Sequence, residues 1–271
     1  MRPEYPKRSN GQLKFLVALK FLTVLPLPER REASLKEIGG STVYFPVVGI
    51  IIGLILAGLN WLLRLFLPVP LVTALLLVAI VLINGALHLD GFIDTCDGIA
   101  GHKTVEERLK ILRDSHVGSF GIVGAILLLL VKYAALSAVP GPLLWVALIL
   151  MPVISRWTMV YAIFAYPYAR RTGLGTIYKQ ETKWPALLLA TMATVLVVVA
   201  GLYFFGPMAY IIPSGVVVMG GTWLVTIIVA SFLKARLSGL TGDSYGAINE
   251  TAEVSVLILV SLLLYNQGRW I

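Results

Sequence analysis

Long apolar runs separated by short polar segments dominate the chain. A helix that crosses the hydrocarbon core of a bilayer needs about 20 mostly apolar residues, and seven runs are of this kind. They cover residues 43–63, 71–89, 117–139, 143–166, 185–205, 208–232 and 254–264, the last of which is short. The pattern predicts an all-α, polytopic membrane protein with about seven transmembrane helices in a single domain, residues 1–271.

One further apolar stretch, residues 15–28, precedes these runs. Lys20 interrupts it, and Pro26 and Pro28 break it. It is too short to span a bilayer, so we expect an N-terminal helix that lies in the membrane interface.

Composition agrees with this fold class. Hydrophobic residues make up 58% of the 271 positions and charged residues 13%, whereas soluble domains carry about 25% charged residues. An ordinary soluble enzyme is therefore excluded. The single cysteine, Cys96, excludes an internal disulfide and a cysteine-rich metal site.

The basic residues indicate the orientation in the membrane. Of the 22 Lys and Arg residues, 18 fall in the N-terminal segment 1–42 and in the loops 90–116, 167–184 and 233–253. Basic residues accumulate on the cytoplasmic side of membrane proteins, so we expect the N-terminus and these three loops in the cytoplasm. This bias explains the net charge of +8 without nucleic-acid binding.

The acidic residues are concentrated in one of these loops. Four of the five aspartates, Asp90, Asp94, Asp97 and Asp114, lie within 25 residues, and the fifth is Asp243. If the 71–89 helix continues through the first three, their spacing puts them within about 60° of one another around the helix axis. We therefore expect three carboxylates on one narrow face at the cytoplasmic end of a transmembrane helix.

Like charges this close repel one another unless a cation lies among them. Carboxylate oxygens favour Mg²⁺, Mn²⁺ or Ca²⁺ over zinc or copper. Asp90, Asp94, Asp97 and Asp114 are therefore candidate metal ligands. The alternative is a solvated helix face whose acids pair with Lys103, Arg108 and Arg113.

The segment after this face predicts a hairpin. Thr104 and Glu107 have the spacing of a capping box that opens a short helix, residues 105–113. Such a hairpin can return Asp114 to the acidic face, as a fourth oxygen ligand or as a base. Arg113 and His116 flank Asp114, and for each the alternative is an ordinary interfacial residue.

Two other positions are candidates. Arg156 lies inside a predicted span, where a charge is costly and usually faces a polar cavity or a partner carboxylate. Its alternative role is a structural ion pair. Asp243 lies in a glycine-bearing loop before the last span, and its alternative role is a helix cap.

Clustered carboxylates and nearby basic residues at a membrane edge favour metal-assisted phosphoryl transfer. The metal would neutralise a diphosphate, Arg and Lys would hold its other oxygens, and a carboxylate would deprotonate an attacking hydroxyl. A Walker phosphate loop is missing from the sequence. One alternative is a CDP-alcohol type lipid phosphotransferase, whose signature matches only in part because Thr95 follows Asp94. Another is a cation- or proton-coupled transporter.

A closer resemblance runs through most of the chain. Stretches in the same order look like the cobalamin synthase (adenosylcobinamide-GDP ribazoletransferase) family: 21–28 (FLTVLPLP), 45–49 (FPVVG), 88–98 (HLDGFIDTCDG), 113–115 (RDS) and 241–247 (TGDSYGA). The resemblance implies a multi-pass enzyme of the bacterial inner membrane. A hydroxyl of α-ribazole, or of its 5′-phosphate, attacks the cobinamide-linked phosphate of adenosylcobinamide-GDP. GMP leaves, the product is adenosylcobalamin or its phosphate, and Mg²⁺ is required.

The resemblance also implies roles for individual residues, at the positions of this chain that match the motifs of the family. Asp90, Asp94 and Asp97 match the first acidic motif of the family, Asp114 the second and Asp243 the third. The catalytic candidates are Asp94, Asp97 and Asp114, and the substrate-binding candidates are Lys103, Arg113, His116, Arg156 and Asp243. The family commonly has Arg where this chain has His116, and an imidazole is mostly neutral at pH 7, so Arg113 or Lys103 would have to replace that phosphate contact. A homo-oligomer is possible, but the sequence does not decide the oligomeric state, because apolar surfaces that face lipid and those that face another subunit have the same composition.

Overall fold

The protein is a bundle of α-helices. The computed structural model describes residues 10–26, 33–101, 103–114, 116–139, 141–205 and 208–267, and among these it contains no β-strand. The helices are α1 (Asn10–Leu22), α2 (Leu35–Gly40), the 3₁₀ turn η1 (Ser41–Tyr44), α3 (Phe45–Leu63), α4 (Val69–Ile83), α5 (Leu87–Ile99), α6 (Val105–Ile111), α7 (Ser119–Ser137), α8 (Gly141–Ala165), α9 (Leu174–Glu181), α10 (Trp184–Phe205), α11 (Met208–Leu237) and α12 (Gly242–Gln267). The expected all-α, polytopic fold is confirmed.

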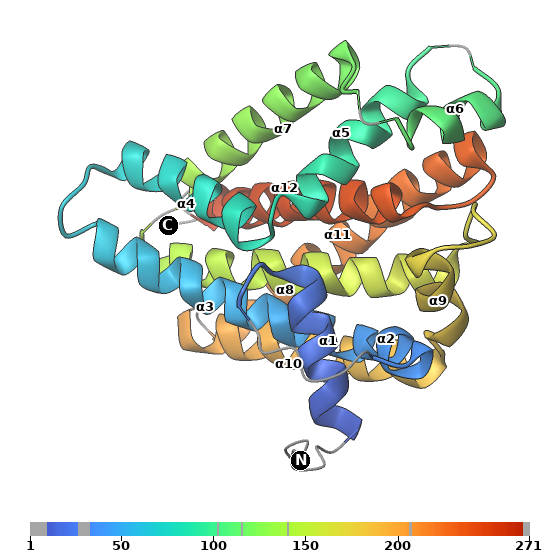
Figure 1. Ribbon diagram of the computed structural model, residues 1–271. Coiled ribbons are helices and arrows are strands. Elements are labelled where there is room, and N and C mark those ends of the chain that lie inside the picture. The colour runs from blue at the N-terminus through green and yellow to red at the C-terminus, as the bar shows by residue number, and fades with distance from the viewer. Residues whose placement is uncertain are drawn as a thin grey trace, which may run out of the picture.

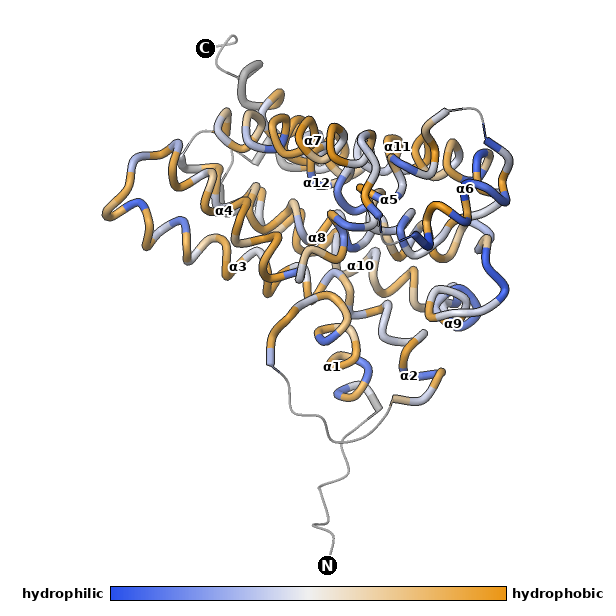
Figure 2. Tube along the Cα trace, turned by 45° about the horizontal axis from the view of Figure 1, so that its top comes forward, coloured by the Kyte–Doolittle hydropathy of each residue, from blue (hydrophilic) through white to orange (hydrophobic). Residues whose placement is uncertain are grey.

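Six helical segments of the described chain are long and apolar enough to cross a membrane, and there are seven if the bent pair of α4 and α5 counts as one span. Apolar residues cover the outer helices of the bundle, whereas hydrophilic residues gather around α6 and α9 (Figure 2). Figure 1 shows α6, α9 and the α11–α12 connection at one end of the molecule and the α3–α4 turn at the other.

Helix α8 lies at the centre of the bundle, between α3, α10 and α12 (Figure 1). Its contact with α3 depends on two glycines. A Cβ atom at Gly49 would lie 2.5 Å from the carbonyl oxygen of Pro152, and one at Gly53 would lie 2.7 Å from the Cα of Ile149. Small residues at such crossings let the backbones of membrane helices approach closely, so the two glycines fix α3 against α8.

The second predicted span is not one straight helix. Helix α4 ends at Ile83, and α5 leaves at an angle of 89°. Gly85 (φ +59°) and Ala86 (φ +57°) both take the left-handed conformation that ends a helix. The expectation that the 71–89 helix continues through the aspartates is therefore wrong, because α5 is a separate helix.

The last span also differs from its expected bounds. Residues 233–253 were expected to form a loop and residues 254–264 the span, but α11 runs to Leu237 and α12 begins at Gly242. The expectation failed because Glu250 and Glu253, whose charge is typical of a loop, are buried inside the bundle. The polar residues of this segment therefore belong to the membrane helix.

The N-terminal segment forms a helix, α1, but this helix begins at Asn10 and ends at Leu22, whereas residues 15–28 were predicted. Its place in the membrane interface stays a prediction. α1 buries Ala18, Leu19 and Leu22, and the ring of Phe21 stacks on Phe45 with a centroid distance of 5.9 Å. Pro28, expected near the end of this segment, lies outside the described residues.

Candidate active site

Helix α5 carries three of the candidate acids. Asp90 is exposed, Asp94 is partly buried and Asp97 is buried. All three lie within the unbroken helix Leu87–Ile99, so their spacing places them on one side of it. The three positions therefore share a side of α5, as expected, but the carboxylate of Asp97 is bound by the N-terminus of α7.

The start of α12 brings Asp243 to this helix. A Cβ atom at Gly91 would lie 2.9 Å from the carbonyl oxygen of Asp243, and one at Gly246 would lie 2.9 Å from that of His88. The two helices therefore cross in direct backbone contact. Asp94 consequently lies within electrostatic range of both Asp90 and Asp243. We call Asp90, Asp94 and Asp243 the acidic site.

Arg170 provides a positive charge at the acidic site. Its Nη2 donates to Asp243 Oδ2 at 3.1 Å and to the carbonyl oxygen of Leu112 at 3.2 Å. Its Nε is buried and makes no hydrogen bond within the described chain. The sequence analysis missed Arg170, because its charge was assigned to the positive-inside bias of the 167–184 loop.

Two connecting segments position Arg170. The Ala169 N–H donates to the Leu240 carbonyl, and the Leu240 N–H donates to the Pro167 carbonyl, both at 2.8 Å. Gly239 has φ +153°, and a Cβ atom there would lie 2.7 Å from the Ala169 nitrogen. This close pairing requires glycine and places Arg170 beside the first turn of α12.

Thr241 and Ser244 cap α12, and Asp243 Oδ2 accepts from Thr241 Oγ1 at 3.2 Å as well as from Arg170. The Thr241 N–H donates to Ser244 Oγ at 3.1 Å, and the Ser244 N–H donates to Thr241 Oγ1 at 3.2 Å. Reciprocal bonds of this kind satisfy N–H groups at the start of a helix.

Asp97 faces a different element from the other two acids of α5. Its Oδ2 accepts the Gly118 N–H at 2.7 Å, and its Oδ1 accepts the Gly121 N–H at 2.8 Å. A Cβ atom at Gly118 would lie 2.4 Å from Oδ1, and one at Gly121 would lie 2.5 Å from Oδ2. Asp97 is therefore held at the N-terminus of α7, where a negative charge is favourable.

The hairpin after α5 forms as expected, but Asp114 pairs with its neighbour. The capping box of Thr104 and Glu107 is present and opens α6. His116 Nδ1 lies 2.6 Å from Asp114 Oδ1 on an exposed loop. This contact raises the pKa of His116 and lowers the pKa of Asp114. Lys103 and Arg113 are exposed, and Ser115 lies outside the described residues.

Arg108 secures the segment between α5 and α6. Its guanidinium donates to the carbonyl oxygens of Gly98, Gly101 and Lys103 at 3.0, 2.9 and 3.2 Å. The structure therefore uses Arg108 to bind the backbone at the end of α5, whereas the alternative of a solvated face had paired it with the aspartates.

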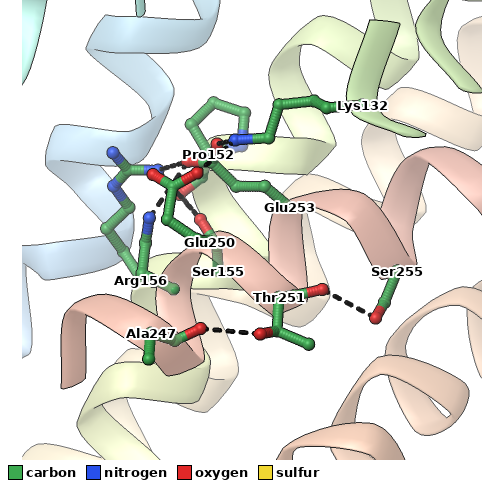
Figure 3. Close-up of polar contacts among 10 residues, drawn as sticks. Lys132, Pro152, Ser155, Arg156, Ala247, Glu250, Thr251, Glu253 and Ser255 are labelled. Carbon is green, nitrogen blue, oxygen red and sulfur yellow. Dashed lines mark hydrogen bonds and ion pairs between the residues drawn. The ribbon is translucent and has the colours of Figure 1, made fainter. Parts of the chain in front are cut away.

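Arg156 lies in a buried ionic network, shown in Figure 3. Its Nη1 donates to Glu253 Oε1, and Lys132 Nζ donates to Glu250 Oε2 at 2.6 Å and to Glu253 Oε2 at 2.7 Å. The expected partner carboxylate of Arg156 is therefore Glu253. Its role in substrate binding stays a prediction. Lys132 also lies inside a predicted span, at 117–139, and the sequence gives no signal that connects it with two glutamates more than 100 residues away.

The acidic site suits one mode of Mg²⁺ binding. Within the described residues, no three His, Cys, Asp or Glu side chains are already grouped as ligands for a metal ion. Proteins commonly hold Mg²⁺ with one or two carboxylates and leave its other positions to water and substrate phosphates. The exposed Asp90 and the partly buried Asp94 are carboxylate donors that fit this mode.

Comparisons with known proteins point to one family. The sequence profile of the family described as Cobalamin-5-phosphate synthase matches residues 14–261. Similar proteins named adenosylcobinamide-GDP ribazoletransferase come from Desulforamulus reducens (38% identical, covering 91% of this chain and 95% of the relative), Desulfitobacterium hafniense (37%, covering 93% and 98%) and Geotalea daltonii (35%, covering 90% and 95%). No solved structure matches the chain.

Proposed function

The chain belongs to the cobalamin-5-phosphate synthase family, and on this premise we propose that it joins adenosylcobinamide-GDP to α-ribazole, or to its 5′-phosphate, with release of GMP and a requirement for Mg²⁺. The products are adenosylcobalamin or its 5′-phosphate. The reaction takes place at the acidic site, on the cytoplasmic side of the bacterial inner membrane.

Asp90 and Asp94 are the residues proposed to hold Mg²⁺. Both come from one side of α5, and neither makes a hydrogen bond to another described side chain that would compete for its oxygens. Mg²⁺ bound there would neutralise the diphosphate and stabilise the leaving phosphate. Asp97 contributes less directly, because both of its oxygens already accept backbone N–H groups of α7.

The reaction is a substitution at phosphorus. The ribazole hydroxyl oxygen forms a bond to the cobinamide-linked phosphorus, the bond from that phosphorus to the oxygen bridging to GMP breaks, and the electron pair leaves with GMP. The hydroxyl proton must pass to a base. Among the catalytic candidates, we assign this role to Asp94, because Asp97 is held by two N–H groups and Asp114 by His116.

Basic residues around the acidic site are proposed to bind the substrate. Arg170 is held between Asp243 and the Leu112 carbonyl and has an unpaired Nε. Because Nε is buried and Nη2 is already bonded, Nη1 is the group left to donate to a phosphate oxygen. Lys103, Arg113 and His116 lie on the adjoining hairpin and provide further donors.

The observation that carries this proposal is the convergence of Asp94, Asp243 and Arg170 at the crossing of α5 and α12, in a chain of this family. The purified protein in detergent, given adenosylcobinamide-GDP and α-ribazole, is expected to release one GMP for each corrinoid product. Chelation with EDTA should stop the reaction, and added Mg²⁺ should restore it.

Other substrates in the same assay separate the alternatives. α-Ribazole 5′-phosphate in place of α-ribazole shows which nucleophile is preferred. Turnover of CDP-linked lipids without a response to adenosylcobinamide-GDP would replace the proposal with a lipid phosphotransferase. Solute flux in proteoliposomes without GMP release would replace it with a transporter.

A further inference from the structure

Four ionisable side chains are buried together in the membrane part of the bundle. Lys132 comes from α7, Arg156 from α8, and Glu250 and Glu253 from α12. Their side chains are between 0 and 5% exposed. We call these four residues the charge network. It contains two positive and two negative groups, so its formal charges balance.

Glu253 is the centre of the charge network. Its Oε2 accepts from Lys132 Nζ at 2.7 Å, and its Oε1 accepts from Arg156 Nη1 and from Asn249 Nδ2, the latter at 3.2 Å. Lys132 also bonds Glu250 at 2.6 Å. The network thereby joins α7, α8 and α12, of which α12 is distant from the other two in the sequence (Figure 3).

Stability alone does not account for this arrangement. Buried ion pairs give up favourable hydration, and apolar residues of similar volume often replace them at no cost in stability. Inside a membrane the loss of hydration is larger still, and ionisable groups there usually serve function. A functional role therefore explains the charge network better than a contribution to stability alone.

The charge network lies close to the acidic site. Seven residues separate Asp243 from Glu250 along α12, which is about 10 Å of helix. α5 packs against both α7 and α12. Its Asp97 binds the N-terminus of α7, and its Gly91 touches Asp243 of α12. The spacing of α7 and α12 therefore decides where α5 presents Asp90 and Asp94.

Lys132 bridges these two helices. It is the member of the network on α7, and both of its carboxylate partners are on α12. A further contact between the two helices is the hydrogen bond that Ser261 Oγ donates to the Ala135 carbonyl oxygen at 3.0 Å. The ion pairs of Lys132 are the only ionic link between α7 and α12 among the described residues.

We propose that Lys132, through Glu250 and Glu253, is a positioning residue for catalysis, which holds α7 and α12 at the spacing that the acidic site on α5 requires. This inference rests on the proposed function. It predicts that loss of the α7–α12 bridge lowers kcat, because the acids of α5 are displaced. Arg170 keeps its contacts with Asp243 and the Leu112 carbonyl, since neither partner lies on α7.

The test uses a variant that removes the bridge and keeps the buried charge balanced. Lys132→Met with Glu250→Gln leaves Arg156 paired with Glu253. We expect kcat for GMP release to fall at least tenfold, with KM for adenosylcobinamide-GDP within twofold of the wild type and an unchanged melting temperature. A kcat within twofold of the wild type, or a change confined to KM, overturns the proposal.

A reversed bridge distinguishes positioning from charge balance. Lys132→Glu with Glu250→Lys keeps one positive and one negative group across the same two helices, and we expect it to recover at least part of the lost kcat. If the variant with the reversed bridge has the same kcat as the variant without the bridge, the proposal is overturned. Should the first double variant not fold, Lys132→Gln with Glu250→Gln takes its place, because it also removes the ion pairs of Lys132 and keeps the charge balanced. A kcat within twofold of the wild type then overturns the proposal, and a larger fall supports it.

Two controls complete the design. Thr194→Val on α10 removes a buried hydroxyl that bonds only its own helix, at the Ala190 carbonyl, and should leave kcat unchanged. Wild-type protein from the same preparation separates the two hypotheses. Absence of GMP release by the wild type contradicts the proposed function, whereas an active wild type with an equally active bridge-free variant contradicts the positioning role.

Discussion

At the scale of single residues, the three aspartates of α5 have different roles because they have different partners. Asp90 is exposed and Asp94 partly buried at the acidic site, whereas Asp97 accepts two N–H groups at the N-terminus of α7. The i, i+4, i+7 spacing could predict that the three share a side of α5. It could not predict the capping role, because the α7 backbone meets Asp97 only in the folded chain.

The two hydrogen bonds of Asp97 give a stability prediction. Asp97→Asn replaces one acceptor oxygen with an amide that faces an N–H group, so we expect the free energy of unfolding to fall by about 1–3 kcal/mol. Thermal denaturation in detergent measures this. Asp90→Asn, at an exposed position of the same helix, is the control and should change little. Equal melting temperatures of the two variants would contradict the assigned role.

Arg170 gives a prediction about substrate binding. Arg170→Gln removes a cation from the acidic site, and we expect KM for adenosylcobinamide-GDP to rise about tenfold, equivalent to about 1.4 kcal/mol. The neighbouring Arg171 is exposed, so Arg171→Gln should leave KM within twofold. Steady-state kinetics on both variants tests this, and the same KM in both would remove Arg170 from the binding site.

At the scale of elements, the length of an apolar run predicts a membrane helix well where polar residues or turns bound the run on both sides. α7, α8 and α10 begin and end within a few residues of the predicted bounds, because loss of backbone hydration in lipid forces an apolar run into a helix. The α4–α5 bend and the true start of α12 were missed. The bend depends on local backbone conformation at Asn84–Ala86, and α12 contains charges that are paired only by distant helices.

The bend itself is testable through Ala86. Alanine at φ +57° occupies a conformation that costs an L-residue about 1–2 kcal/mol, whereas glycine adopts it readily. Ala86→Gly should therefore raise the melting temperature. Ala79→Gly, inside α4, should lower it, because glycine costs about 1 kcal/mol in a helix interior. A lower melting temperature for Ala86→Gly would contradict the left-handed bend.

At the scale of the whole molecule, the start of α12, which carries Asp243 of the acidic site, lies at the end of the bundle with α6 and α9, opposite the α3–α4 turn (Figure 1). The charge bias predicts that this end faces the cytoplasm. In a Cys96→Ser background, a membrane-impermeant maleimide should label Arg171→Cys only from the cytoplasmic side. Phe66→Cys, in the α3–α4 turn, should react only from the other side. Reversed labelling would contradict the orientation.

The central claim is that the carboxylates of α5 hold Mg²⁺ against the diphosphate of the substrate. The most direct measurement is GMP release by wild type and Asp94→Asn over a range of Mg²⁺ concentrations, at saturating adenosylcobinamide-GDP and α-ribazole. The account predicts that Asp94→Asn stays folded but loses turnover, or needs at least tenfold more Mg²⁺ for half-maximal rate. An Asp94→Asn variant with the wild-type rate and the wild-type Mg²⁺ dependence would contradict it.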